Sequence, residues 1–141
     1  MAEKVSAERL AQAEEIAEKL LCAPVYYFSE LKPSELTDGL AVVYAIFDIL
    51  TGETLYVGRT KNLRQRLYYN HLMGPKSNAR LKKYLTEDPN MPSIQSMEEA
   101  KRFLRERCCF RFLPESDMRT RGQVEGLLSF LLDVRYIHEE H

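Results

Sequence analysis

The stretch Leu40-Ala-Val-Val-Tyr-Ala-Ile-Phe-Asp-Ile-Leu-Thr-Gly-Glu-Thr-Leu-Tyr-Val-Gly58 decides the fold expected for this chain. Its first half is apolar except for Asp48, and Thr51-Gly52-Glu53 then interrupts the run. Two runs of β-branched and aromatic residues around a glycine turn are typical of a β-hairpin. Because the first run lacks polar alternation, we expect a central strand that is covered on both faces.

The composition fits a single intracellular globular domain. The chain has 141 residues, of which 45% are hydrophobic and 29% charged. No apolar run approaches the roughly 20 residues needed to cross a bilayer, and the charged N-terminus lacks the apolar core of a signal peptide. Cys22, Cys108 and Cys109 are odd in number and lack CxxC spacing, which predicts reduced thiols. We therefore expect a cytoplasmic, nucleoid or nuclear protein with no membrane partner.

Apolar spacing and capping residues place the other elements around this hairpin. They predict helices at residues 6–22, 62–73, 78–85, 97–107 and 119–132, and a third strand at 108–113. Ser77 is the expected cap of the third of these helices, and residues 25–28 form either a short strand or a packed loop. The order predicts an α+β fold, with a small three-stranded antiparallel sheet flanked by helices. Residues 1–39 supply an extra N-terminal helix and linker, and residues 40–141 form the main domain.

The charges are unevenly distributed along the chain. The net charge is −1, yet residues 59–86 hold eight basic side chains and no acidic one. An acid-free segment sets up a local positive field, which is the pattern expected for phosphate binding. The alternative is a solvated helical surface that happens to be basic. The eight basic residues are Arg59, Lys61, Arg64, Arg66, Lys76, Arg80, Lys82 and Lys83.

A few polar side chains are candidates for chemistry. Tyr44 and Tyr56 lie on the two hairpin strands, and a three-residue turn would put them on one face. Arg66 on the next helix suits a phosphate, because its planar guanidinium can hold two oxygens. Glu125 lies near the inward face of the last helix and needs a partner. That partner is either Mg²⁺ or a salt bridge, for example to Arg119 or Arg121.

These residues resemble the motifs of the GIY-YIG nuclease domain. Val42-Val43-Tyr44 and Leu55-Tyr56-Val57-Gly58 stand for the two tyrosine motifs, and Arg66 follows Gly58 by eight residues, which is the family spacing. Glu125, with Leu128, Leu131-Leu132 and Arg135-Tyr136, is similar to the later segment that carries the family's catalytic glutamate. The resemblance covers residues 40–136.

The resemblance implies a metal-dependent endonuclease that hydrolyses phosphodiester bonds in DNA. Tyr44 would activate the attacking water with help from Tyr56, and a cationic neighbour would lower the pKa of the tyrosine. Arg66 would hold the scissile phosphate, and Glu125 would bind one Mg²⁺ or Mn²⁺ ion. Gly58 would let the chain approach a phosphate closely, or would simply be a turn residue. Residues expected to contact DNA are Arg59, Lys61, Asn62, Arg64, Arg80, Lys82 and Lys83.

The chain departs from the family at two positions. Many members have His or Tyr twelve residues after the motif glycine, where this chain has Asn70, with His71 one residue later. His71 takes that catalytic place through a small shift of the helix, or it lies on the surface. Many members also have Asn where this chain has Ile137.

These departures motivate an alternative to the endonuclease, a GIY-YIG-like module that binds nucleic acid with little or no cleavage. A third interpretation is a protein-interaction domain that uses the acidic helix at 6–22, which could pack on the sheet or oligomerise the protein. Repair, recombination and mobile-element processing all remain open as the DNA process.

Overall fold

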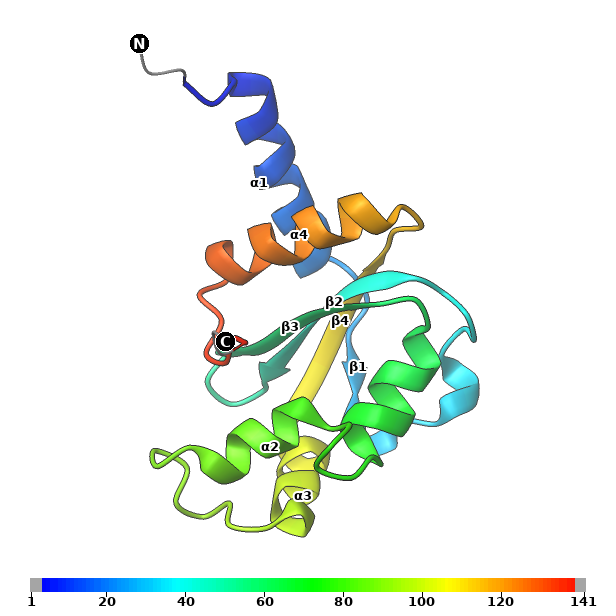
Figure 1. The fold of residues 1–141 in the computed structure, drawn as a ribbon, viewed down its shortest axis with the longest axis vertical. Helices are drawn as coiled ribbons and strands as arrows, with labels where there is room; N and C mark the ends of the chain where they lie inside the picture. The colour runs from blue at the N-terminus through cyan, green and yellow to red at the C-terminus, as the bar shows by residue number, and fades with distance from the viewer. Residues whose placement is uncertain (1–3, 139–141) are drawn as a thin grey trace.

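The expected hairpin is present in the computed structural model, which describes residues 4–138, and its first strand lies in the interior of the sheet. β2 (Val42–Asp48) pairs antiparallel with β3 (Thr54–Thr60), and β4 (Cys108–Pro114) pairs antiparallel with the other edge of β2. Every residue of β2 is buried. The predicted central strand, covered on both faces, is therefore confirmed (Figure 1).

The sheet has four strands, so the expectation of three was wrong. β1 (Tyr26–Tyr27) pairs with β4, and the strand order is β1-β4-β2-β3. Tyr26 stacks on Phe110 and Phe112 of β4, with ring centroids 5.4 and 5.5 Å apart. A two-residue strand has no periodicity that a sequence pattern can detect, and the cross-strand aromatic contacts that stabilise it exist only after folding.

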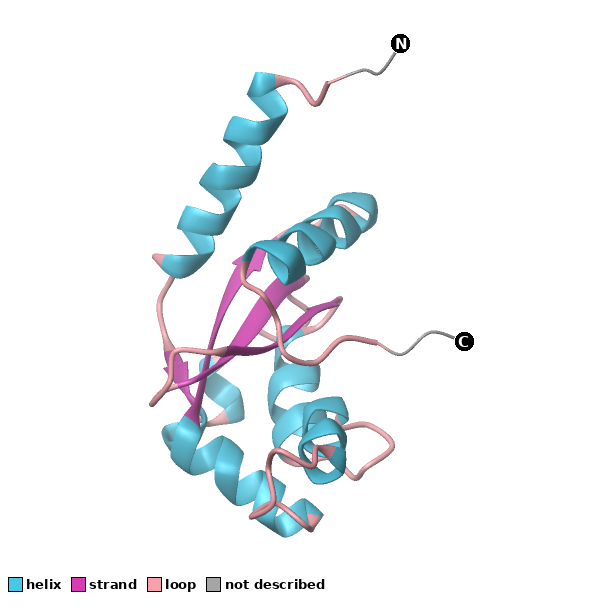
Figure 2. Cartoon of the chain, turned by 90° about the vertical axis from the view of Figure 1, so that its left-hand side faces the viewer, coloured by secondary structure: helices cyan, strands magenta, loops and turns pink. Residues whose placement is uncertain are grey.

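Helices cover both faces of the sheet (Figures 1 and 2). Val43, Ala45 and Phe47 of β2 face one core cluster, together with Leu20 and Leu128. The opposite face of β2 contributes to the larger core, in which side chains of η3, α2 and α3 are buried. The helices are α1 (Ala7–Leu21), η1 (Phe28–Glu30), η2 (Pro33–Glu35), η3 (Gln65–Leu72), α2 (Arg80–Glu87), α3 (Met97–Arg107) and α4 (Met118–Leu131).

The capping residues predict some helix starts and miss another. Ser96 caps α3 by accepting a hydrogen bond from the backbone N–H of Glu99 at 3.1 Å, as expected. Ser77 does not cap α2, which begins at Arg80 after Ala79, a residue with no capping side chain. The expected start at 78 was therefore wrong: the backbone N–H groups of Asn78 and Ala79 both donate to the oxygen of Pro75 at 2.9 Å, in a turn that precedes the helix.

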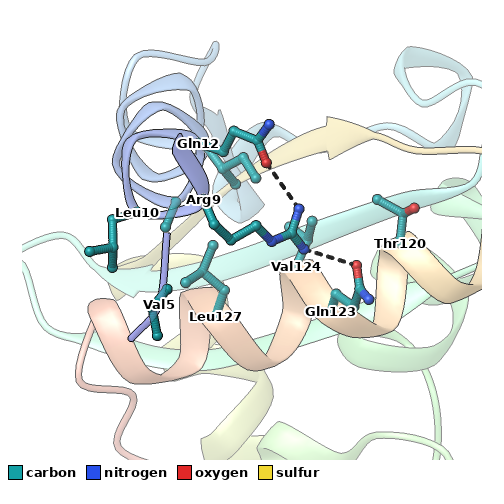
Figure 3. Close-up of a pocket in the computed structure, with 10 residues that line it drawn as sticks. Val5, Arg9, Leu10, Gln12, Thr120, Gln123, Val124 and Leu127 are labelled. Carbon is teal, nitrogen blue, oxygen red and sulfur yellow. Dashed lines mark hydrogen bonds between the residues drawn. The ribbon is translucent and has the colours of Figure 1, made fainter. Parts of the chain in front are cut away.

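The N-terminal helix is only partly attached to the domain. Of its apolar residues, Leu20 is buried, whereas Leu10 is 58% exposed. A cavity of about 380 Å³ lies between α1 and α4, and Arg9 donates to Gln123 across it at 3.3 Å (Figure 3). Leu131 of α4 is also exposed, at 44%. Within residues 4–138, no helix has both the length and the apolarity needed to cross a membrane.

The register of the hairpin places Tyr44 directly opposite Gly58. A Cβ atom at residue 58 would lie 2.4 Å from the hydroxyl oxygen of Tyr44. Gly58 is therefore the residue that makes room for the Tyr44 ring in the middle of a strand; it is not part of a turn, as had been considered.

We expect Gly58→Ala to lower the free energy of unfolding by about 1–3 kcal/mol, because a buried tyrosine must move away from the added methyl group. Gly126→Ala in α4 is the matched control, since no atom lies within 4 Å of the added Cβ. Its removal of a helical glycine should raise stability by about 0.5–1 kcal/mol. Urea unfolding should show a lower midpoint for Gly58→Ala and a higher one for Gly126→Ala than for the wild-type protein. An unchanged midpoint for Gly58→Ala would contradict this packing.

Candidate active site

Tyr44 and Tyr56 lie on the same face of the sheet. Tyr44 pairs with Gly58 and Ile46 pairs with Tyr56, so the two tyrosines are diagonal neighbours on adjacent strands. Their rings stack with centroids 6.2 Å apart and an interplanar angle of 21°. The segment that links the strands is longer than the three residues considered from the sequence, but the resulting register still gives the shared face.

Arg66 joins the two tyrosine hydroxyls. Its Nε donates to the hydroxyl of Tyr44 at 3.1 Å, and its Nη2 donates to the hydroxyl of Tyr56 at 3.4 Å. The third nitrogen, Nη1, makes no hydrogen bond to the described part of the chain. The guanidinium is therefore oriented by two fixed oxygens and still has donors for a ligand.

His71 is buried in the same cluster, which decides between the two placements left open by the sequence. Its Nε2 lies 2.7 Å from the Tyr44 hydroxyl, and its ring meets that of Tyr56 edge-on at 5.0 Å. η3 is a π-helix, which has more residues per turn than an α-helix and often occurs at functional sites. This winding changes which side chains face the sheet, and it brings His71 into the site although His71 comes one residue later than in many family members.

Burial sets the protonation of this cluster. Burial, followed by the neighbouring Tyr56, raises the pKa of Tyr44 above its ordinary 10.0, and Arg66 only partly opposes this. The pKa of Tyr56 is raised by burial too. Burial, then the charge of Arg66 and those of Lys82 and Arg80, holds the pKa of His71 well below 6.5. A net lowering of the tyrosine pKa by cations was expected and is not found; both tyrosines are protonated and His71 is neutral at neutral pH.

The hydrogen bonds assign the tautomer of His71. Its Nδ1 is buried and has no hydrogen-bond partner within residues 4–138. An unpaired buried N–H is rarer than an unpaired acceptor, so we assign the proton to Nε2. Nε2–H then donates to Tyr44, whose oxygen accepts from both His71 and Arg66. The hydrogen of the Tyr44 hydroxyl is left for a third partner.

Glu125, on α4, lies close enough to this cluster for its charge to act on Tyr44. It is partly buried, and its negative charge is one of the influences that raise the pKa of Tyr44. The salt bridges considered from the sequence do not form: Arg121 donates to the backbone oxygens of Glu115 and Ser116, and none of the ion pairs found between residues 4 and 138 includes Glu125.

The side chains that could bind a metal ion at this site are few. No group of three or more His, Cys, Asp or Glu side chains suited to a metal occurs in the described residues. Mg²⁺ commonly uses one or two carboxylates and completes its shell with waters and substrate phosphates. A lone carboxylate such as Glu125 fits that mode of binding, and it does not fit a site built from protein ligands alone.

Four of the basic candidates for DNA contact are exposed: Arg59, Lys61, Arg80 and Lys83. Arg59 extends from β3 to α4, where its Nη1 occupies the space that a side chain at Gly122 would need. The charge of Arg80 acts on both Tyr56 and His71, so Arg80 lies near the tyrosine cluster.

Three other candidates for DNA contact are engaged within the protein. The amide of Asn62 donates to Asp38 at 2.9 Å and accepts from the backbone of Gly39 at 3.0 Å. Arg64 donates through Nε to the oxygen of Leu36 at 2.9 Å. Lys82 is only 3% exposed. A buried ammonium cannot reach DNA, so the expectation for Lys82 is corrected to an internal role.

The sequence did not reveal an aromatic row that extends the site. The ring centroid of Tyr84 on α2 lies 6.4 Å from that of Tyr56. The ring of Tyr136 stacks on Tyr84, with centroids 5.6 Å apart. The hydroxyl of Tyr136 donates to Asp88 at 2.7 Å, and Arg135 pairs with the same carboxylate at 2.8 Å. Ile137, one of the two departures from the family, follows this row and is exposed.

The family comparison agrees with this geometry. Residues 40–107 match the model of the GIY-YIG catalytic domain, a segment that contains both tyrosines, Arg66 and His71 but not Glu125. Searches among curated proteins and among solved structures gave no match. Residues 40–107 of this chain are therefore similar to the GIY-YIG catalytic domain, which is a domain of nucleases.

Proposed function

We propose that this protein is an endonuclease that hydrolyses phosphodiester bonds in DNA and uses Mg²⁺ or Mn²⁺. The observation that carries the proposal is the convergence of Tyr44, Tyr56, Arg66 and His71 on one hydrogen-bonded cluster. Glu125 adds a carboxylate that is in none of the ion pairs found among the described residues. This is a set of groups suited to phosphoryl chemistry, because it combines a phosphate-binding cation with an oriented hydroxyl.

Arg66 would bind the scissile phosphate. Two of its nitrogens are fixed by the tyrosine hydroxyls, so little orientational freedom remains to be lost when a phosphate binds. Its positive charge would stabilise the extra negative charge that develops on the phosphate oxygens in the transition state.

Tyr44 would orient the attacking water. Its oxygen accepts hydrogen bonds from Arg66 and His71, which directs its own hydrogen toward a third partner and stabilises negative charge on the oxygen. Because its pKa is raised, Tyr44 stays protonated until further positive charge arrives. A divalent cation held by Glu125 would supply that charge and would stabilise the leaving oxygen.

The exposed cations Arg59, Lys61, Arg80 and Lys83 support DNA as the substrate. Each would neutralise backbone phosphates without reading sequence, so binding should weaken steeply as salt is raised. Binding without cleavage is the alternative function, and the first experiment below separates the two.

Glu125→Gln should lower the rate of plasmid or branched-DNA nicking in Mg²⁺ at least about 100-fold, because the change removes the charge that holds the cation. DNA affinity measured in Ca²⁺ should stay within about twofold, since phosphate contacts dominate affinity. Glu14→Gln on the exposed side of α1 is the control and should nick normally. Nicking by Glu125→Gln at the wild-type rate would exclude Glu125 as the metal ligand, and absence of nicking by the wild-type protein would favour the binding module.

Arg66→Lys should lower single-turnover cleavage by about 100-fold and leave the Kd for DNA nearly unchanged, because lysine keeps the charge but cannot hold two phosphate oxygens. Lys83→Ala provides the contrast. It should weaken binding of all DNA sequences, reduce the salt slope by about 1, and leave cleavage at saturating DNA unchanged. If Arg66→Lys lost binding and cleavage equally, Arg66 would be a backbone contact only.

A further inference from the structure

Lys82 is a buried lysine that the proposed chemistry does not use. It lies on α2, where it is buried together with Leu81 and Leu85. Only 3% of its surface is exposed. Burying an ammonium group costs free energy unless hydrogen bonds compensate for lost water. The contacts of Lys82 therefore indicate what its burial achieves.

Both of its contacts go to the end of the helix that carries the site. Its Nζ donates to the backbone oxygen of Leu72 at 2.8 Å and to that of Gly74 at 2.9 Å. The last carbonyls of a helix lack partners within the helix and carry partial negative charge, so an ammonium group is well suited to them. Leu72 directly follows His71, and Lys82 thus holds the backbone next to the residue that donates to Tyr44.

The charge of Lys82 also acts on His71. After burial and Arg66, it is the next influence that lowers the pKa of His71, ahead of Arg80. Burial, followed by the charge of Lys101 on α3, lowers the pKa of Lys82 itself to about 8. Lys82 is in no ion pair among residues 4–138. Its positive charge is therefore directed at the helix end and at His71.

We propose that Lys82 is a positioning residue, which fixes the C-terminal end of η3 so that His71 Nε2 meets the Tyr44 hydroxyl. The inference rests on the proposed function for its effect on cleavage, but its effect on His71 is independent of any activity. Without Lys82, the carbonyls of Leu72 and Gly74 would lose their donor, and the last turn of η3 would be free to rewind.

The first test is an NMR titration of the histidine rings in the full chain without DNA. In Lys82→Met, the pKa of His71 should shift upward toward 6.5, because a positive charge is removed and the ring is less tightly held. In Lys82→Arg, which keeps the charge, and in Lys19→Met on α1, it should stay low. Lys82→Gln, which keeps a donor without the charge, replaces Lys82→Met if that variant does not fold. Unchanged His71 resonances in the folded uncharged variant would overturn the inference.

The second test is kinetic. Lys82→Met should lower kcat by on the order of tenfold to a hundredfold with KM within about twofold, because the contact positions a group and does not bind DNA. Lys82→Arg should restore kcat to within about threefold, whereas equal effects of both variants on KM would mean that Lys82 acts on DNA binding. If the wild-type protein does not cleave but the His71 shift is seen, the proposed function fails and this inference stands. If the wild-type protein cleaves and Lys82→Met leaves both His71 and kcat unchanged, the inference alone fails.

Discussion

The hydroxyl of Tyr44 is the point at which the parts of this fold meet. The ring is fully buried on the central strand, and Gly58 on the neighbouring strand leaves the space that it occupies. Its oxygen accepts hydrogen bonds from Arg66 and His71, both supplied by η3. Because a buried hydroxyl without partners costs free energy, the position of η3 against the sheet and the placement of Tyr44 depend on each other. The covered central strand therefore serves the site as well as the core.

Placing this cluster in the interior has a clear electrostatic consequence. Burial favours the neutral forms of tyrosine and histidine, so Tyr44 keeps its proton and His71 takes none up. The charged members are cations: Arg66 within the cluster, and Lys82 and Arg80 close enough to affect His71. Glu125 is the carboxylate whose charge reaches Tyr44. Under the proposed function, this balance of charges would suit a negatively charged phosphate and a cation beside Glu125.

The sequence predicted the hairpin, the later strand and most helices, because these depend on local periodicity and capping. Predictions about single side chains were less successful. Lys82 was assigned to DNA because it lies in the acid-free basic segment, whereas its hydrogen bonds to the end of η3 are tertiary contacts. The two-residue β1 was left open, since its stability comes from Tyr26 stacking on Phe110 and Phe112 of a distant strand. Ser77 was chosen as a cap by local rules, but the helix begins later, at Arg80, after a turn closed by hydrogen bonds to the oxygen of Pro75.

The sequence by itself determined the resemblance to the GIY-YIG domain, through Tyr44, Tyr56, Gly58 and Arg66 at their spacing, and the central position of the apolar strand. These features are local in the chain, so they can be read without the fold. The tertiary structure decided that Gly58 leaves space for the Tyr44 ring, and that Glu125 has no salt bridge within the described residues. It also decided that His71 enters the site, because the phase of a π-helix depends on what holds its end. Lys82 holds that end through hydrogen bonds to two backbone oxygens, and no sequence pattern predicts a hydrogen bond between a side chain and a distant backbone oxygen.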